Sequence, residues 1–253
     1  MSNTNPASLP VEAVLPDLLR CLAEQGGAVL EAPPGAGKST RVPLALLAAP
    51  WRGDGRILVL EPRRVAARAV ATFMARQLGE PVGATVGYRT RLDSRIGATT
   101  RVEVVTEGVL TRLLLDDPSL DGYAAVLFDE FHERSLQADL GLALVQEVRG
   151  ALREDLRLLV MSATLAVGPL AEGLGLPVVR SEGRVFPVTV DHAPPARDGD
   201  PLDHCARQVA ALAGEGTTLV FLPGVREIER VRERLAGGPP VSVLHGRLDG
   251  DAQ

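Results

Sequence analysis

The sequence predicts an α/β fold in which a doubly wound, parallel β-sheet is covered by helices. The first observation is that short apolar runs alternate with helical patterns along most of the chain. The second is that these runs are nearly continuously apolar, which indicates strands that are buried on both faces. The third is the alternation of strand and helix itself, which is typical of doubly wound domains.

The elements of the first part of the chain follow from this pattern. The predicted strands cover residues 28–31, 57–60, 102–105, 125–128, 158–161 and 177–179. The predicted helices lie near residues 38–48, 63–78, 107–115, 136–150 and 168–174. In such a sheet the carboxyl ends of the strands share one edge, so residues that follow different strands are expected to meet there.

A second cycle of elements is predicted after Gly183. Residues 186–190 are expected to be extended, and residues 193–201 are rich in Pro, Gly and Asp, which is typical of a linker. Two helices and two strands follow, with the helices near 202–213 and 225–235 and the strands at 218–222 and 241–244.

These elements predict a division of the chain into four parts. They are a flexible N-terminus (1–10), a first domain (11–182), a linker (183–201) and an incomplete second domain (202–253). Two or three strands bury too little surface for a complete α/β domain. We therefore expect the sequence to be part of a longer protein.

The composition excludes several classes of protein. A chain of 253 residues that is 45% apolar and 23% charged is typical of a soluble globular protein. The net charge of −5 argues against a uniformly basic surface for nucleic acid, although it allows a local basic groove. Cys21 and Cys205 show no disulfide or metal-binding spacing. Because the sequence shows neither a membrane span nor a secretory signal, we expect a cytoplasmic protein.

The only lysine of the chain lies in a glycine-rich segment. Of the 27 basic residues, Lys38 alone is a lysine, and it belongs to A-P-P-G-A-G-K-S-T at residues 32–40. In a phosphate-binding loop, or P-loop, Gly35 and Gly37 allow backbone N–H groups to point at phosphate oxygens. The helix that begins near Lys38 adds its positive end, the lysine reaches the β- and γ-phosphates, and the Ser39 hydroxyl can ligate Mg²⁺.

The P-loop prediction names a contiguous set of nucleotide contacts. The usual pattern begins with glycine, whereas this segment begins with alanine. The alternative is a glycine-rich turn that binds no ligand. The expected nucleotide-binding residues are Ala32, Pro33, Pro34, Gly35, Ala36, Gly37, Lys38, Ser39 and Thr40.

Two adjacent carboxylates follow the predicted strand 125–128, within V-L-F-D-E-F-H-E-R at residues 126–134. Asp129 is expected to hold hydrated Mg²⁺, together with Ser39 and Glu130. Glu130 is expected to orient and deprotonate an attacking water, and His132 to couple the γ-phosphate state to the neighbouring unit. The alternative is that the acidic residues only end the strand and cap the next helix.

A weaker signal is M-S-A-T at residues 161–164, directly after another apolar strand. The hydroxyls of Ser162 and Thr164 are expected to hydrogen-bond to the carboxylates and to report the state of the nucleotide. The alternative is an ordinary turn between a strand and a loop.

Taken together, these segments resemble the motifs of a helicase family. P-G-A-G-K-S-T, E-P-R-R-V-A-A-R-A-V-A, D-E-F-H-E-R-S and S-A-T resemble superfamily 2 helicases of the DEAH/RHA group. D-E-F-H, A-P-P-G-A-G-K-S-T and V-G-Y-R-T-R-L-D-S are most similar to the bacterial HrpB-type ATP-dependent helicases. The resemblance covers about residues 10–250. It implies a RecA-like P-loop NTPase domain followed by part of a second RecA-like domain.

The resemblance also implies contacts with the backbone of a nucleic acid. The matching residues are Pro62, Arg63 and Arg64, and then Thr106, Glu107 and Gly108. Guanidinium groups, hydroxyls and a helix N-terminus all suit phosphate oxygens. A basic stretch that contains Arg89, Arg91, Arg95 and Arg101 either extends this groove or forms a solvated hairpin.

Two departures from the family pattern affect the expected activity. Phe73 stands where related proteins often have an arginine that stacks on the nucleotide base, so stacking would lack its cation–π component. The family's later element that supplies arginine fingers does not occur before Gln253. Finger arginines contribute roughly three to five orders of magnitude in rate. We therefore expect this chain alone to bind ATP·Mg²⁺ weakly and to hydrolyse ATP slowly.

The leading interpretation is an ATP-dependent helicase, by resemblance an RNA helicase, that uses ATP and Mg²⁺ and is monomeric by default. One alternative is an ATP-gated RNA clamp or remodelling factor without processive unwinding, which a strand-displacement assay would distinguish. Another is a P-loop ATPase that acts on protein, for which neither RNA nor DNA would stimulate hydrolysis.

Overall fold

The computed structural model describes residues 9–163, 167–182, 187–245 and 248. The chain divides into two compact units, Met1–Val185 and Phe186–Gln253, here called unit 1 and unit 2. Among the described residues, no helix combines the length and the apolar character that a membrane crossing requires.

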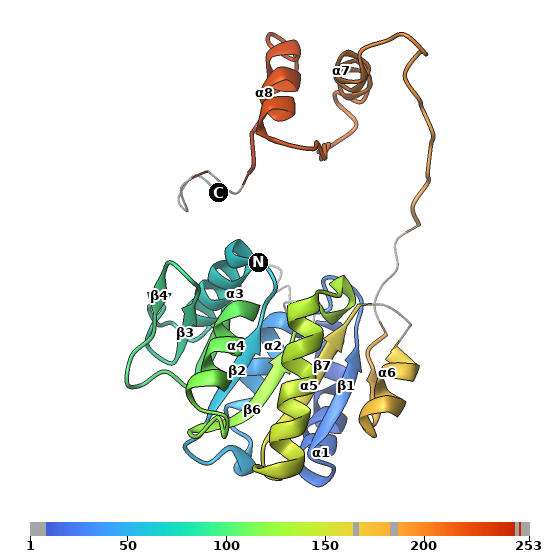
Figure 1. Cartoon of the computed structure of the whole chain (residues 1–253). Coiled ribbons are helices and arrows are strands. Elements are labelled where there is room, and N and C mark those ends of the chain that lie inside the picture. The colour runs from blue at the N-terminus through green and yellow to red at the C-terminus, as the bar shows by residue number, and fades with distance from the viewer. Residues whose placement is uncertain (1–8, 164–166, 183–186, 246–247, 249–253) are drawn as a thin grey trace, which may run out of the picture. The chain divides into compact units, whose positions relative to one another are not determined.

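Unit 1 is built on a single eight-stranded sheet (Figure 1), in the order β4-β3-β5-β2-β6-β7-β1-β8. All neighbouring strands are parallel except β3 and β4. The predicted α/β class with a mostly parallel sheet is therefore confirmed. The strands are β1 (Gly27–Glu31), β2 (Arg56–Leu60), β3 (Val86–Arg89), β4 (Ser94–Arg95), β5 (Val102–Val105), β6 (Tyr123–Phe128), β7 (Arg157–Ser162) and β8 (Val178–Arg180).

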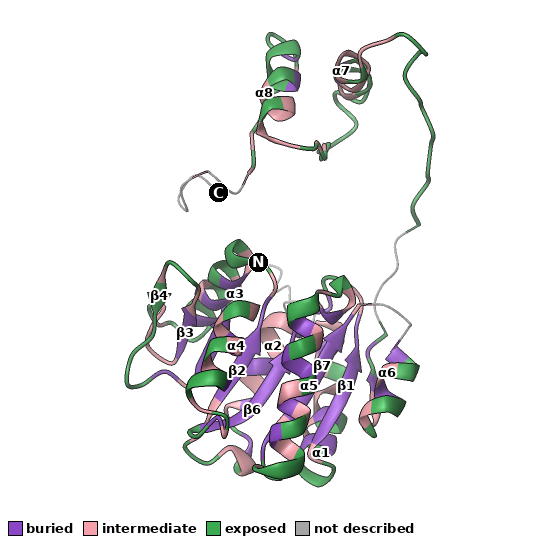
Figure 2. Ribbon diagram, viewed as in Figure 1, coloured by how far each residue is buried: buried purple, intermediate pink, exposed green. Residues whose placement is uncertain are grey.

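Helices cover both faces of this sheet, and the strands between them are buried (Figure 2). On one face α1 (Leu15–Glu24), α2 (Lys38–Leu46) and α3 (Arg64–Gln77) pack against strand residues such as Ile57 and Leu127. On the other face α4 (Glu107–Asp116), α5 (Leu136–Ala151) and α6 (Val167–Leu174) pack against neighbours such as Leu58 and Phe128. Successive strand residues thus enter opposite cores, which is why the strands are continuously apolar. Three 3₁₀ turns complete unit 1, namely η1 (Pro10–Val14), η2 (Pro50–Arg52) and η3 (Phe131–Glu133).

The boundaries of the predicted elements in unit 1 lie within two residues of the observed ones. The sequence pattern missed α1, the edge strand β4 and its neighbour β3. Strand β3 is short and contains Gly87, where a Cβ atom would lie 2.3 Å from the carbonyl oxygen of Arg95. A glycine that breaks an apolar run hides a strand from pattern analysis, but here it permits the close approach of β4.

Unit 2 contains two helices, α7 (Pro201–Ala211) and α8 (Val225–Arg234), around a small core of Ala206, Val231 and Leu235. Asp200 caps α7 by accepting a hydrogen bond from the Leu202 amide at 2.8 Å, and it pairs with Arg234 at 2.9 Å. The predicted helices near 202–213 and 225–235 are therefore present.

The strands predicted at 218–222 and 241–244 are wrong, since neither segment is a strand in the structure. Leu219, Phe221 and Leu244 are exposed. A strand is stabilised by hydrogen bonds to a neighbouring strand and by burial of its side chains. Within the described residues of unit 2, neither segment pairs with another strand, and Leu222 is only partly buried against the small core. The extended segment predicted at 186–190 begins at a residue outside the described ones, and residues 187–190 carry no strand assignment.

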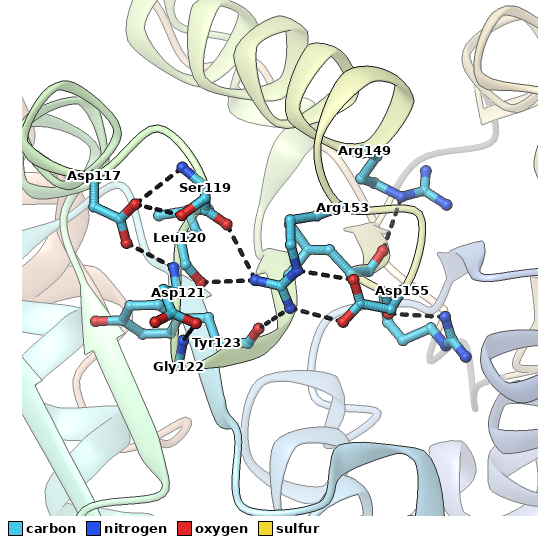
Figure 3. Close-up of polar contacts among 11 residues, drawn as sticks. Asp117, Ser119, Leu120, Asp121, Gly122, Tyr123, Arg149, Arg153 and Asp155 are labelled. Carbon is cyan, nitrogen blue, oxygen red and sulfur yellow. Dashed lines mark hydrogen bonds and ion pairs between the residues drawn. The ribbon is translucent and has the colours of Figure 1, made fainter.

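Arg153, in the turn after α5, joins the end of that helix to the connection that leads into β6 (Figure 3). Its guanidinium donates hydrogen bonds to the carbonyl oxygens of Ser119, Leu120 and Tyr123 at 3.0–3.1 Å. It also donates to both carboxylate oxygens of Asp155 at 2.8 Å. Leu120 has a φ of +48°, so its carbonyl belongs to a backbone conformation that a leucine rarely adopts. The fork of donors on Arg153 therefore stabilises this turn, together with Asp117, whose carboxylate accepts from Ser119 and Asp121.

We expect Arg153→Lys to destabilise unit 1 by about 2–4 kcal/mol, because one ammonium cannot satisfy three carbonyls in a fork geometry. The measurement is urea unfolding followed by the fluorescence of Trp51, the only tryptophan of the chain, which lies in unit 1. As a control, Arg20→Ala removes only an exposed pair with Asp17 and should change stability by less than about 1 kcal/mol. Equal effects of the two substitutions would contradict the assigned role of Arg153.

Glu61 follows β2 and is a buried carboxyl group with only 4% of its surface exposed. Burial, together with the negative charge of Asp129, raises its pKa from the ordinary value of 4.5 to about 8. The amide of Arg63 acts in the opposite direction. Glu61 therefore retains its proton at neutral pH in the folded protein, whereas the unfolded chain releases it at a lower pH.

The sign of the resulting pH dependence follows from proton linkage. Between pH 4.5 and about 8 the folded state binds more protons at Glu61, so stability falls as the pH rises, by up to about 1.4 kcal/mol per pH unit. We expect Glu61→Gln, which cannot ionise, to gain stability relative to wild type progressively across this window. Urea unfolding at a series of pH values checks this. A wild-type-to-variant difference that stays constant with pH would refute the prediction.

Candidate active site

The glycine-rich segment forms the connection between β1 and α2. Gly35 and Gly37 have φ values of +77° and +92°, a region that favours glycine. A Cβ atom on Gly37 would also come within 2.7 Å of the Leu9 side chain. The Ala32 amide donates to the carbonyl of Ser162 at 3.0 Å, so the loop is joined to the end of β7. The loop therefore turns sharply at the carboxyl edge of the sheet, where α2 begins at Lys38.

Lys38 and Glu130 form the central contact of the site. The Lys38 Nζ donates to Glu130 Oε1 at 2.6 Å, although the two residues are 92 positions apart. The lysine side chain is 5% exposed and that of Glu130 is 27% exposed. The strand register explains this meeting, because Glu31 pairs with Ser162 and Phe128 pairs with Val160. The strands that precede both residues thus end at the same edge, with only β7 between them.

Asp129 lies deeper in the same site and is 4% exposed. Burial raises the pKa of its carboxyl, while the Ser39 hydroxyl and the Lys38 charge counteract this. Its Oδ1 accepts a hydrogen bond from the Glu130 amide at 2.9 Å. Its Oδ2 is buried and has no hydrogen-bond partner within the described part of the chain. A buried carboxylate oxygen beside a serine hydroxyl fits a group that binds a hydrated divalent cation.

Glu130 and His132 are held in an unusual backbone segment. Glu130 has φ and ψ of 48° and 35°, in the left-handed region, and η3 follows it directly. His132 Nδ1 accepts a hydrogen bond from the Ala163 amide at 3.3 Å. Its Nε2 lies 3.4 Å from Glu130 Oε2. The histidine therefore connects the carboxylate to the segment after β7, and strain of this kind is often found at functional sites.

The other residues expected to contact the nucleotide differ in their burial and in their distance along the chain from the P-loop. Ser162 is buried at the end of β7, beside the P-loop. Thr164 lies outside the described residues. Phe73 lies on α3 and its surface is 52% exposed, so the aromatic ring is open to solvent. The role of Phe73 as a base-stacking residue stays a prediction. The role of Glu130 as a metal ligand also stays a prediction, and the two carboxylate oxygens of Glu130 face Lys38 and His132.

The residues expected to contact nucleic acid flank this site. Arg63 and Arg64 are exposed at the start of α3 and Pro62 is partly buried. Thr106 precedes α4, and Gly108 is exposed in its first turn. Glu107 accepts a hydrogen bond from the Ser135 hydroxyl at 2.6 Å, and Ser135 also caps α5 by accepting from the Ala138 amide.

A cavity of about 220 Å³ adjoins both the carboxylates and some of these residues. Its lining includes Asp129 and Glu130 together with Pro62, Arg63 and Glu107. Glu133 and Ser135 also line it, and the sequence analysis assigned no role to either. Both belong to the D-E-F-H-E-R-S segment, which the sequence analysis singled out. Their partners, Arg63 and Glu107, lie far away in sequence, so the pattern did not indicate these contacts.

Arg89 lies at a second cavity of about 510 Å³, which Arg91, Thr106, Gly108 and Arg112 also line. Strands β3 and β4 pair as a hairpin, with Tyr88 opposite Arg95, so the basic stretch is a hairpin whose first two arginines face a cavity. The Arg89 guanidinium pairs with the fully buried Glu103 at 2.9 Å. Glu103 also accepts from the Tyr123 hydroxyl at 2.9 Å, and burial beside this carboxylate raises the tyrosine pKa to about 12. The sequence shows a charged residue within this apolar strand, but not that Arg89 and Tyr123 are its partners.

Two curated proteins are similar to this chain in sequence. The chain is 53% identical over 233 residues to the ATP-dependent RNA helicase HrpB of Escherichia coli, covering 91% of this chain and 29% of that protein. It is 33% identical to the HrpA homolog of Haemophilus influenzae, an ATP-dependent RNA helicase, covering 91% of this chain and 18% of that protein. The chain thus spans less than a third of the length of these relatives.

Two solved structures share the fold of this chain. The crystal structure of the Escherichia coli DEAH/RHA helicase HrpB matches with a TM-score of 0.90 and 50% identity, over 97% of this chain and 32% of that one. A crystal structure of the E. coli DExH-box NTPase HrpB matches with a TM-score of 0.82 and 49% identity, over 99% of this chain and 32% of that one. The RecA-like fold predicted for the sheet domain is therefore confirmed. A family model described as DEAD/DEAH box helicase matches residues 12–172, which is most of the chain and includes the whole site, and the chain accordingly belongs to the DEAD/DEAH box helicase family.

Proposed function

We propose that this chain provides the ATP-binding and ATP-hydrolysing site of an ATP-dependent RNA helicase. The observation that carries the proposal is the contact between Lys38 Nζ and Glu130 Oε1 at 2.6 Å. It brings a phosphate-binding ammonium and a candidate base to one point at the carboxyl edge of a parallel sheet. The relatives named above are ATP-dependent RNA helicases, which supports RNA as the nucleic acid.

The P-loop would bind the triphosphate through its backbone N–H groups and the N-terminus of α2. Lys38 would neutralise charge between the β- and γ-phosphates, and it would then exchange Glu130 for phosphate oxygens. Asp129 and Ser39 would hold hydrated Mg²⁺, which would neutralise charge on the phosphates. The buried Oδ2 of Asp129 is suited to this role because it has no hydrogen-bond partner among the residues described.

Glu130 would orient the attacking water and accept its proton. Once Lys38 binds the phosphates, the Glu130 carboxylate is released from the ion pair and becomes a better proton acceptor. His132 would hold the second oxygen of Glu130 and transmit its position to Ala163, whose amide donates to the ring. This connection joins the hydrolytic site to the segment that follows β7.

RNA would bind along the edge formed by Arg63, Arg64, Thr106 and Gly108. These groups suit phosphates rather than bases, so binding should depend weakly on sequence and strongly on salt. We further propose that residues 202–253 belong to a second domain, and that arginines from the rest of such a domain complete the ATP site. The chain alone should then hydrolyse ATP slowly.

Two substitutions test the proposed ATP site. Lys38→Ala should weaken ATP binding and turnover together, because it removes the cation that holds the phosphates. Glu130→Gln should keep ATP binding but reduce the turnover number by at least about 100-fold, because an amide is a poor base. A fluorescent ATP analogue measures binding to the chain, and phosphate release by the full-length protein measures turnover.

Turnover should be compared with poly-RNA, with single-stranded DNA and without nucleic acid. Stimulation by RNA supports the proposal, and strand displacement on a duplex distinguishes a helicase from an ATP-gated clamp. If both variants kept wild-type turnover, the assignment of this site would be wrong. If neither nucleic acid changed turnover, the proposed RNA substrate would be wrong.

A further inference from the structure

Arg63 is engaged by a carboxylate of its own chain. Its Nη2 lies 2.8 Å from Glu133 Oε1, and its Nε donates to Glu133 Oε2 at 3.3 Å. Two nitrogens of the guanidinium therefore face two oxygens of one carboxylate. This is the two-pronged geometry in which arginine also binds a phosphate. The carboxylate thus occupies the face of Arg63 that a nucleic-acid phosphate would use.

The position of Glu133 is set by the backbone around it. Glu133 closes the single turn of η3, between Glu130 and Arg134, which have φ values of 48° and 47°. Beyond it, Ser135 caps α5 and donates to Glu107. The backbone of this turn therefore sets where the Glu133 side chain begins, within reach of Arg63. The Glu133 amide donates to the Glu130 carbonyl at 2.9 Å, whereas its carboxylate pairs with Arg63.

The solvent exposure of the Arg63–Glu133 pair determines how strongly Glu133 competes with an RNA phosphate for Arg63. The side chain of Arg63 is 71% exposed and that of Glu133 is 33% exposed. A pair with this exposure is weak enough for a phosphate of RNA to displace the carboxylate. It is strong enough to reduce affinity measurably.

We propose that Glu133 is a positioning residue that withholds Arg63 from RNA, so that an RNA phosphate must displace its carboxylate to bind. The inference rests on the proposed function and deepens it, because it names the residue that sets RNA affinity at this motif. The turn that carries Glu133 begins at Glu130, the partner of Lys38. The residue that withholds Arg63 is therefore attached directly to the ATP site.

The test is nucleotide-free binding of a fluorescein-labelled oligouridylate to the chain, measured by anisotropy. Glu133→Gln should bind about two- to five-fold more tightly than wild type, the range that a partly exposed ion pair allows. The dependence of log affinity on log salt concentration should become steeper by up to about 0.7, as for one additional phosphate contact on a single strand. Both side chains lie at the surface, and a thermal melt verifies that each variant is folded.

Two further variants separate this mechanism from a general loss of negative charge. Asp139→Asn removes a carboxylate next to the same segment, one that pairs with Arg134 at 3.0 Å, and it leaves Arg63 paired. Arg63→Ala removes the group through which Glu133 acts. We expect a smaller gain in affinity for Asp139→Asn, and no gain when Glu133→Gln is added to Arg63→Ala.

The outcomes are distinguishable from failure of the proposed function. If wild type binds RNA but Glu133→Gln gains nothing, the inference fails and the proposed function stands. The inference also fails if the gain equals that of Asp139→Asn, or if it persists in the Arg63→Ala background. If no variant binds RNA, the proposed function itself fails.

Discussion

The parallel register of β1, β7 and β6 is the constraint on which the site depends. Glu31 is level with Ser162, and Phe128 is level with Val160, so the three strands end at one edge. Lys38, Asp129 and Ser162 come from distant parts of the sequence, yet each follows or ends one of these strands. A shift of register in any of them would separate the ammonium from the carboxylates. The packing of alternate strand residues into two apolar cores opposes such a shift.

Side chains of the segment from Asp129 to Ser135 contact residues from four other parts of unit 1. Glu130 contacts Lys38, His132 accepts from Ala163, Glu133 pairs with Arg63, and Ser135 donates to Glu107. One short stretch with two left-handed residues therefore joins the nucleotide site to both predicted nucleic-acid motifs. Coupling between two ligands requires an element whose position both ligands influence. This segment has the contacts that such an element needs.

Buried charges at the sheet are another consequence of the same architecture. Glu61, Glu103 and Asp129 lie on or just beyond central strands and are all at most 4% exposed. Glu103 is stabilised by Arg89 and Tyr123, whereas Glu61 has its pKa raised by burial and by its acidic neighbours. Such groups reduce stability unless they are paired or protonated. Asp129 lines the cavity of about 220 Å³, and Arg89, the partner of Glu103, lines the cavity of about 510 Å³.

The sequence by itself determined the fold class, most strands and helices of unit 1, and the candidate residues of the P-loop and the carboxylate pair. These features are local, because apolar periodicity and a contiguous motif are visible within a short window of residues. Only the tertiary structure decided that Glu133 engages Arg63, that Glu103 engages Arg89, and that residues 218–222 and 241–244 of unit 2 are not strands. Each of these outcomes depends on what lies opposite a residue in space. A side chain finds its ion-pair partner, and a strand its neighbour, through contacts that the order of residues along the chain does not contain.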